Sequence, residues 1–406
     1  MLRSNSIKLF LCLCMGILMT YICMIKKSEL YNKKDTKMST HTLTPTNFPC
    51  PTGPLAVGTT MYYLIDTQRT ESHAHDSAHP YRELMVQVWY PAEGPNRKTP
   101  VNSKTYALSD VPFLDIAQQY PVLIYSHGLM GACNENTALC ENLASHGYVV
   151  VGIAHTYASA LVQFPDGRKI ESALVFGGLN YQQVQVLLNQ EMEVWVADAL
   201  FVLDQLKKYN IQSDTFLYNR LDMNNIGMFG HSFGGATAVQ MCRRDDRIKA
   251  GIDLDGPLNG NDSTNPFHKP CMFILGGLSE TRLQDITPMP EEMLKAYNWS
   301  RKDEKRNMQL TLLPAVNRLA RSIGKDAYKI VIRGAKHATF TDKALLSHDK
   351  LNTNTIDGVI AHTIISSYVR TFFDVYLKQQ DASLLNKNAS RWPDYVVVER
   401  FGDKNY

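Results

Sequence analysis

The stretch "NIGMFGHSFGGATA", residues 225–238, places four glycines around a single serine. An apolar run precedes Ser232 and a run of small residues follows it, which predicts a strand, a tight turn and a helix. Residues 230–234 fit the pattern G-x-S-x-G in that setting. We expect a Cβ at Gly230 or Gly234 to collide with neighbouring backbone, and the turn to be strained. The segment therefore predicts that Ser232 is a nucleophile whose hydroxyl stands clear of the sheet.

Apolar strand-like runs alternate with helical patterns on both sides of this stretch. The strand-like runs cover residues 121–128, 148–155, 225–230, 248–255, 271–277 and 328–334, and the helical patterns cover about 134–145, 186–207 and 356–377. Near-continuous Val and Ile runs between helices indicate a parallel sheet that is covered on both faces. Two earlier strands, 58–66 and 84–91, follow one another directly and are expected to be antiparallel. The sequence thus predicts one α/β domain over residues 51–400, with a mostly parallel central sheet.

Residues 281–326 interrupt the alternation between two of these strands. Helical pieces at 290–298 and 314–323 flank a charged loop in this segment. It follows a strand at the edge of the sheet where binding sites commonly form. We predict an inserted helical segment that covers a site, with a surface elaboration of no particular role as the alternative.

The bulk composition indicates an ordinary folded enzyme or binding protein. The 406 residues are 44% hydrophobic and 20% charged, with a net charge of +3, and this length can bury a large core. The small net charge and the lack of a basic stripe argue against a nucleic-acid partner. The cysteines beyond residue 26 are odd in number and form no C-x-x-C motif, so we interpret them as small buried hydrophobes rather than a disulfide framework. They are Cys50, Cys133, Cys140, Cys242 and Cys271.

The N-terminal segment Leu9–Ile25 is uncharged and flanked by basic residues on both sides. As a helix it would span about 25 Å, between a long signal-peptide core and a short membrane helix. No alanine precedes Ala56, so an A-x-A-like cleavage site is missing, which favours an uncleaved anchor. We predict a signal or membrane-anchor segment at 1–25, a flexible polar linker at 26–50, and a protein that is exported or membrane-anchored.

A serine nucleophile needs a base, usually a histidine that a carboxylate orients. His337, in "RGAKHATFTD", directly follows the last predicted parallel strand, where the base belongs in this architecture. His348 and His362 come later, on a helix or its approach, and are interpreted as surface or packing residues. His231 is adjacent to Ser232 and is expected to point elsewhere. We therefore predict that His337 is the base.

The carboxylate partner should come between the serine and the histidine in the chain. Asp255 ends the strand that follows the serine's turn, at its C-terminal tip. Asp253 lies within that strand, where an unpaired carboxylate would be costly. Glu280, after the next strand, is the alternative. We predict that Asp255 is the acid.

The loop "YSHGLMGA", residues 125–132, ends a predicted strand and contains two glycines that let the backbone turn its amides inward. One backbone N–H of an oxyanion hole belongs in this loop, and the other belongs to the residue after the nucleophile. We predict that Leu129 and Phe233 supply these two N–H groups. The helix that begins beside Ser232 would also favour developing negative charge.

The loop "ESHAHDSAH", residues 71–79, contains three histidines, His73, His75 and His79. Three imidazoles can hold a metal ion, but neighbouring histidines in a polar loop are more often solvated. We predict neither a metal nor a cofactor.

These motifs together resemble the platelet-activating factor acetylhydrolase family, in its plasma-type, lipoprotein-associated phospholipase A2-like group and bacterial relatives, within the α/β-hydrolase superfamily. The resemblance runs in order from residue 52 to about 378. The matching stretches are "TGPLAVGTT", "RELMVQVWYPA", "YPVLIYSHGL", "LASHGYVVVGIAH", "WVADALFVLDQL", "GHSFGGATA", "GIDLDGP" and "KHATFTD". It implies an α/β-hydrolase fold with Ser232, Asp255 and His337 as the triad and Leu129 and Phe233 as the oxyanion hole. It thereby favours Asp255 over the alternative acid.

The resemblance also implies calcium-independent cleavage of short or oxidised acyl chains from the sn-2 ester of a phospholipid, without a cofactor. This chain departs from the family in segments 281–326 and 71–79, so the substrate does not carry over directly. We predict a serine ester hydrolase for lipid-like or short-chain acyl esters, with a membrane surface as a candidate contact. The alternatives are a general carboxylesterase or polyester hydrolase, an acyltransferase, and a non-catalytic binding module. The sequence leaves the oligomeric state open.

Overall fold

The computed structural model describes residues 48–401 except 74–77, 97–99, 103, 116–118, 261–266, 278–287, 289, 297, 306–312, 325, 347–354 and 387–390. The predicted segment at 1–25, the linker up to residue 47 and the alternative acid Glu280 lie outside the described residues. Within them, no helix has the length and apolar character needed to cross a membrane.

A central ten-stranded sheet organises the described chain, in the order β12-β11-β10-β9-β8-β4-β5-β2-β1-β3. Its strands are β1 (Ala56–Thr70), β2 (Tyr81–Ala92), β3 (Leu108–Ser109), β4 (Tyr120–Ser126), β5 (Val149–Ala154), β8 (Leu221–His231), β9 (Ile248–Leu254), β10 (Cys271–Gly276), β11 (Ala327–Ile332) and β12 (Val396–Phe401). The run from β5 to β11 is parallel, whereas β1, β2 and β12 pair antiparallel with their neighbours on at least one side. The predicted mostly parallel sheet and its antiparallel first pair are confirmed.

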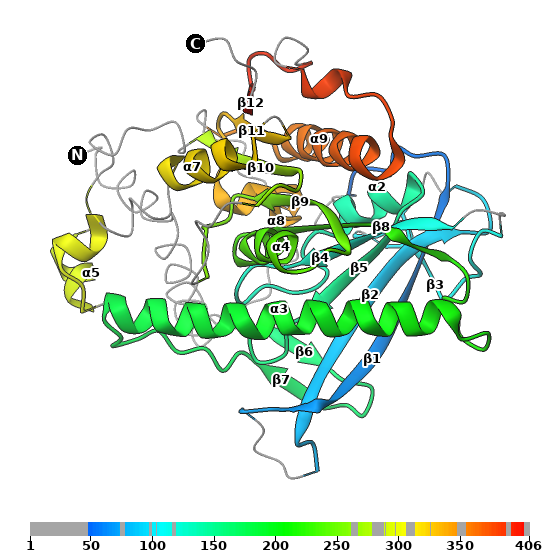
Figure 1. The fold of residues 1–406 in the computed structure, drawn as a ribbon, viewed down its shortest axis with the longest axis horizontal. Helices are drawn as coiled ribbons and strands as arrows, with labels where there is room; N and C mark the ends of the chain where they lie inside the picture. Colours follow the sequence, from blue (N-terminus) through cyan, green and yellow to red (C-terminus); the bar gives the residue numbers. More distant parts are fainter. Residues whose placement is uncertain are drawn as a thin grey trace, which may run out of the picture.

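Helices cover both faces of this sheet. On one face, α4 (Phe233–Arg244) packs against β8 and β9, and α3 (Tyr181–Ile211) packs against α4. On the other, α2 (Thr137–Ser145) and α9 (Gly358–Lys378) contact each other and the strands. Figure 1 shows α3 running across the molecule, past β2 and β1. Each face has its own apolar core, and the strands between them are buried on both sides. This is why they read as continuous apolar runs.

Local signals fix where the two longest helices begin. The Asn180 side chain accepts the Gln183 N–H at 3.0 Å, and the Gln183 side chain accepts the Asn180 N–H at 2.8 Å. This capping box satisfies two N–H groups that have no partner within the helix. In the same way, Asp357 accepts the N–H groups of Val359 and Ile360, the second and third residues of α9. As a result α3 starts five residues before the predicted position of about 186, and α9 starts close to its predicted position.

The segment 281–326 contains the two predicted helical pieces as α5 (Glu291–Ala296) and α7 (Leu313–Ile323). α7 contacts β10, β11 and β12, so this part of the segment belongs to the layer that covers the sheet. Near α5, the Trp299 ring packs edge-on against Tyr181 at the start of α3, with 5.2 Å between ring centroids.

The sequence interpretation missed several short elements. They are β3, the hairpin of β6 (Leu161–Gln163) and β7 (Lys169–Glu171), and β12, together with η4 (His337–Phe340), α8 (Lys343–Leu346) and η5 (Ser383–Leu385). Two or three residues are too few to show a hydrophobic period. Pairing with another strand determines these elements instead: β3 pairs with the distant β1, and β6 pairs with the nearby β7. The five cysteines among the described residues form no disulfide, and Cys140, Cys242 and Cys271 are buried, as predicted.

Candidate active site

Ser232 lies at the junction between β8 and α4, in a strained conformation with φ 56° and ψ −122°. Its N–H donates to the carbonyl of Leu254 at 2.9 Å, which ties the turn to the end of β9. A Cβ built at Gly230 would lie 2.3 Å from the carbonyl oxygen of Gly234, and one built at Gly234 would lie 2.1 Å from that of Ser126. Both are too close for any side chain. The predicted strained turn and its need for glycine are confirmed.

Asp255 and His337 form a hydrogen-bonded pair beyond the ends of β9 and β11, the two parallel strands on either side of β10. His337 Nδ1 lies 2.8 Å from Asp255 Oδ2, and the other carboxylate oxygen accepts the Gly276 N–H at 2.9 Å. Asp255 has φ 54° and follows β9 directly, while His337 opens η4 five residues after β11. Because Asp255 accepts from Nδ1, the other nitrogen of His337 is left to act as an acceptor. Burial, followed by the neighbouring His231, lowers the pKa of His337, although Asp255 acts in the opposite direction.

His337 also lies beside the turn that carries the serine. Its ring centroid is 4.4 Å from that of His231, the residue before Ser232. The ring nitrogens of His231 face Glu135 and the carbonyl oxygen of His337 rather than Ser232, so His231 is engaged elsewhere than at the serine, as expected. Among the hydrogen bonds of the described residues, none joins Ser232 Oγ to His337. Catalytic hydrogen bonds are often loose without substrate and tighten in the complex.

Two of the rejected candidates occupy structural positions. Asp253 is fully buried, and one of its oxygens accepts the Gly256 N–H at 2.7 Å while the other has no partner. Burial raises the pKa of Asp253 well above its usual range, which disfavours the charged form that a triad acid needs. His362 packs on α9 beside Ser366, and burial lowers its pKa to about 4. The other candidates, Glu280 and His348, lie outside the described residues.

The two predicted oxyanion donors lie on either side of Ser232. Phe233 is the first residue of α4, so its N–H has no carbonyl one turn earlier to bond. Gly128, which precedes Leu129, approaches so closely that a Cβ built on it would lie 3.2 Å from the Ser232 Cβ. In the loop, Gly128 and Met130 donate their N–H groups to protein acceptors, whereas no acceptor among the described residues takes the Leu129 N–H. The N–H groups of Leu129 and Phe233 are thus free to bind an anion.

A buried histidine that the sequence interpretation did not single out fixes the peptide between Gly128 and Leu129. His127 Nδ1 donates to the Gly128 carbonyl at 2.6 Å, and the Gly131 N–H donates to the same oxygen at 2.8 Å. In a trans peptide the C=O and the N–H of the next residue point in opposite directions. Holding this carbonyl therefore also sets the direction of the Leu129 N–H. The signal was present in the sequence, because His127 immediately precedes the glycine in "YSHGL".

Replacing His127 by leucine is expected to lower kcat for ester hydrolysis by about 10- to 100-fold. Complete loss of an oxyanion donor lowers kcat by about 10²–10³-fold, and a Leu129 N–H that is present but poorly oriented should cost less. KM should change little, because the Leu129 N–H binds the uncharged carbonyl of the bound substrate more weakly than it binds the oxyanion of the transition state. His127→Asn, which keeps a donor near the position of Nδ1, should recover part of the loss. Steady-state kinetics of the two variants check this, and equal losses in both would contradict it.

A second chain of Ser, His and Asp side chains begins in residues 125–132, the loop that contains the predicted oxyanion donor Leu129 and is called the oxyanion loop below. Ser126 Oγ donates to His155 Nε2 at 2.9 Å, and His155 Nδ1 donates to Asp198 Oδ2 at 2.9 Å. All three residues are completely inaccessible to solvent, so no ester can reach this serine. Burial lowers the pKa of His155 to about 4, and the ring stays neutral. This arrangement is structural, although its side chains match those of a catalytic triad.

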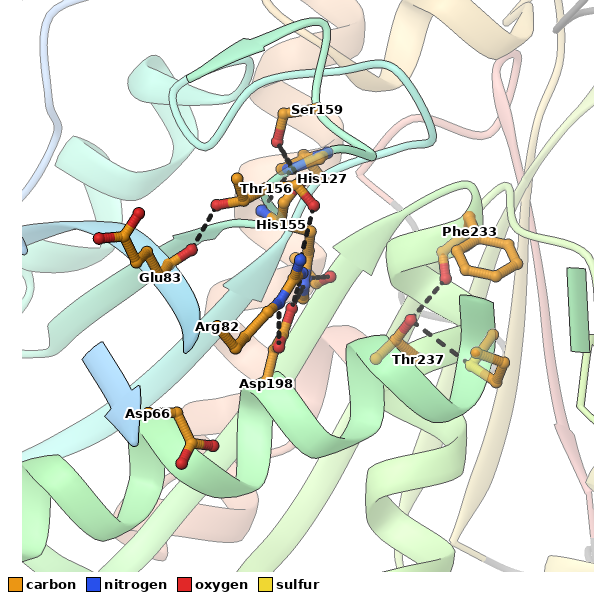
Figure 2. Close-up of polar contacts among 12 residues, drawn as sticks. Asp66, Arg82, Glu83, His127, His155, Thr156, Ser159, Asp198, Phe233 and Thr237 are labelled. Carbon is orange, nitrogen blue, oxygen red and sulfur yellow. Dashed lines mark hydrogen bonds and ion pairs between the residues drawn. The ribbon is translucent and has the colours of Figure 1, made fainter. Parts of the chain in front are cut away.

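Asp198 also binds a buried arginine, as Figure 2 shows. Arg82 Nε and Nη2 donate to its two oxygens at 3.0 and 2.6 Å, and Arg82 Nη1 donates to Glu71 at 2.7 Å. Burial acts to raise the pKa of Asp198, but Arg82 and His155 outweigh it and hold the pKa well below its usual range. Trp195, stacked on the His155 ring at 3.8 Å, meets Phe233 edge-on at 4.9 Å. Through Trp195, the buried network around Asp198 therefore packs against Phe233, the predicted donor of the second oxyanion N–H.

The histidine-bearing loop shows no metal site in the part that the structure describes. His79 Nδ1 lies 3.1 Å from Glu83, and the His73 ring packs near Tyr157. No group of three metal-ligating side chains occurs among the described residues, and His75 lies outside them.

Comparison with known proteins shows the family to which this sequence belongs. The family model described as "Platelet-activating factor acetylhydrolase, isoform II" matches residues 95–358, more than half of the chain. The chain is 27% identical over 291 residues to a "Probable 1-alkyl-2-acetylglycerophosphocholine esterase" of Arthroderma benhamiae, covering 69% of this chain and 66% of that protein. It is 24% identical over 310 residues to the platelet-activating factor acetylhydrolase of Cavia porcellus, covering 69% and 61%. In both cases the match spans slightly less than two thirds of the relative's length.

A solved structure shows the same fold. A ferulic acid esterase from Streptomyces cinnamoneus superposes with a TM-score of 0.63 at 22% identity, covering 88% of this chain and 99% of that one. At this identity the likeness concerns the fold alone, which is the predicted α/β-hydrolase fold. With the family match over residues 95–358, which contain Ser232 and the predicted acid and base, the chain belongs to the platelet-activating factor acetylhydrolase, isoform II, family.

Proposed function

We propose that this protein is a serine carboxylic ester hydrolase that acts on lipid-like or short-chain acyl esters. The observation that carries the proposal is the Asp255–His337 pair, held at 2.8 Å beside the strained turn of Ser232. The free N–H groups of Leu129 and Phe233 support it, because they lie where negative charge would develop on an attacked carbonyl. The names of the relatives support the same reaction class.

In this mechanism Ser232 Oγ attacks the ester carbonyl while Nε2 of His337 takes its proton. The N–H groups of Leu129 and Phe233 hold the tetrahedral oxyanion. The C–O bond to the alcohol then breaks, and His337 returns the proton to the departing oxygen. Water attacks the acyl-enzyme with the same base, releasing the carboxylic acid and restoring Ser232. Asp255 keeps the proton of the neutral imidazole on Nδ1.

The lowered pKa of His337 suits this role. A base must be unprotonated, so kcat/KM should rise as pH increases through the pKa of His337. Because burial and His231 lower that pKa from 6.5, the rise falls on the acidic side of neutrality. The base is then available at physiological pH.

For the substrate, we propose an ester with a short acyl group on a glycerophospholipid, as the printed names of the relatives suggest. Purified protein would be assayed on 1-alkyl-2-acetylglycerophosphocholine and on p-nitrophenyl acetate. Faster turnover of the phospholipid supports the proposal, and turnover of the phenyl ester alone indicates a general carboxylesterase. In parallel, a fluorophosphonate probe should attach to the peptide that contains Ser232, as mass spectrometry would show. A folded protein with neither labelling nor hydrolysis would exclude the serine mechanism.

We also propose that the uncharged segment 9–25 directs the protein to a membrane or out of the cell. Cell fractionation of the full chain beside a variant lacking residues 1–25 tests this. Equal distribution of the two forms in the cytosolic fraction would contradict it.

A further inference from the structure

Glu135 makes contacts with both loops that flank the serine's turn. It lies just before α2, and its Oε1 accepts the Gly128 N–H at 2.7 Å and lies 3.3 Å from Nδ1 of His231. The Tyr125 hydroxyl reaches the same oxygen at 3.2 Å. Its side chain is only 9% exposed, and that of His231 is 7% exposed. One carboxylate therefore joins the oxyanion loop to the residue before Ser232.

His231 continues this chain of contacts to the base. Its Nε2 lies 3.2 Å from the backbone carbonyl oxygen of His337. A carbonyl only accepts hydrogen bonds, and so does an ionised carboxylate. Both contacts can be hydrogen bonds at once only when both ring nitrogens of His231 carry a hydrogen, as in the protonated imidazolium.

We propose that Glu135 and His231 form a largely buried carboxylate–imidazolium pair that positions the oxyanion loop and the base loop on the turn of Ser232. Neither side chain contacts a reacting atom in the mechanism above, so both are positioning residues. The proposal rests on the proposed ester hydrolase activity for its kinetic consequence, but the charge of His231 can be measured without it.

The electrostatics of the site agree with such a pair. Burial acts to raise the pKa of Glu135, yet His231 outweighs it and the pKa falls to about 2. The other groups that face Glu135 are Tyr125, His127 and Asp342, and burial raises the pKa of Asp342 well above its usual range. Glu135 is therefore the charged acid of this cluster.

The pair also affects the base itself. His337 faces Asp255, His231 and Glu135, and a cation at His231, whose ring centroid is 4.4 Å away, opposes protonation of His337. Glu135 acts to raise the pKa of His337, but more weakly than His231 lowers it, so the pair as a whole lowers the pKa of the base. Any change that discharges His231 should raise the pKa of the base.

Glu135→Gln tests the pair while keeping an acceptor for the Gly128 N–H. Without the carboxylate, His231 becomes neutral and no longer opposes protonation of His337. The acid limb of the kcat/KM profile is expected to move to higher pH by about one unit, with a fall in kcat larger than the change in KM. His231→Gln should move the limb in the same direction, because it also removes the cation. An unmoved limb in a folded, active Glu135→Gln protein overturns the proposal.

The matched control is Glu141→Gln, which removes another buried carboxylate nearby. Glu141 lies on α2 and accepts hydrogen bonds from Thr105 and from the N–H groups of Tyr106 and Ala107, away from the serine. This variant should leave the acid limb where it is. A limb that moves equally in Glu141→Gln would show that any buried charge has the same effect, and would overturn the specific role of Glu135.

Nitrogen-15 NMR of the histidine-labelled protein measures the pair independently of activity. If the pair forms, the His231 resonances should show two protonated nitrogens, whereas a neutral ring would show one. Its resonances are assigned by their loss in His231→Gln. A neutral His231 in the unmodified protein overturns the proposal whether or not Glu135→Gln folds. A cationic His231 in a protein that hydrolyses no ester would keep the pair and refute the proposed function.

Discussion

Replacing Ser232 by alanine is expected to lower kcat for ester hydrolysis by about 10⁶-fold, the scale seen when a triad nucleophile is removed. Alanine cannot form the acyl-enzyme, so only the oxyanion hole and substrate binding would still accelerate the reaction. The fold should persist, because alanine keeps the Cβ and meets the same φ of 56° as serine does. Kinetics on p-nitrophenyl acetate, with circular dichroism to verify folding, measure the effect.

The buried chain behind the oxyanion loop supplies the control. Ser126→Ala removes a serine with the same kind of partners as a catalytic one, but at a site that solvent cannot reach. Ser126→Ala should keep fluorophosphonate labelling, and Ser232→Ala should lose it. The opposite pattern in two folded proteins would identify Ser126, and not Ser232, as the nucleophile.

Replacing Asp198 by asparagine is expected to lower the free energy of unfolding by about 3–5 kcal/mol, the cost of breaking a buried ion pair. The change leaves Arg82 with a full charge in the interior and only Glu71 to balance it. Asp198 Oδ2 accepts from Arg82 Nη2 and His155 Nδ1, and Oδ1 accepts from Arg82 Nε. An amide has one oxygen and one NH2 group, so asparagine would leave at least one of these donors facing another donor. Urea denaturation at neutral pH measures the loss.

Asp204→Asn is the matched control on the same helix. Asp204 is 66% exposed, and its partner Arg247 lies 2.5 Å away at the surface. An exposed pair typically contributes about 0–1 kcal/mol, so this variant should unfold almost as the unmodified protein does. Similar losses in both variants would mean that burial does not decide the strength of the Asp198 pair.

The sequence predicted the architecture and placed the candidate nucleophile, acid and base at strand ends. This was possible because each signal is local: Ser232 has its glycines beside it, and Asp255 and His337 directly follow apolar runs. In a parallel sheet such ends meet at one edge, so position along the chain translates into position in space. The observed Asp255–His337 hydrogen bond agrees with this reasoning.

What the sequence did not predict depends on contacts between distant residues. Arg82 and Asp198 are 116 positions apart, and no periodic pattern relates them. The orientation of His231 depends on Glu135 and on the carbonyl of His337, neither of which is near it in the chain. Edge strand β12 follows a stretch without regular apolar period, and its pairing with β11 determines where it lies.

The antiparallel pairing of β12 with β11 has a consequence for biosynthesis. β11 leads into the loop that carries His337, and β12 covers its otherwise open edge along residues 327–332. Chains emerge from the ribosome N-terminus first, so the turn of Ser232 is released well before the strand that closes this edge. A nascent chain stalled ahead of β12 would expose a bare row of N–H and C=O groups beside the base. The edge of the sheet beside His337 therefore stays open until residues 396–401 have been translated.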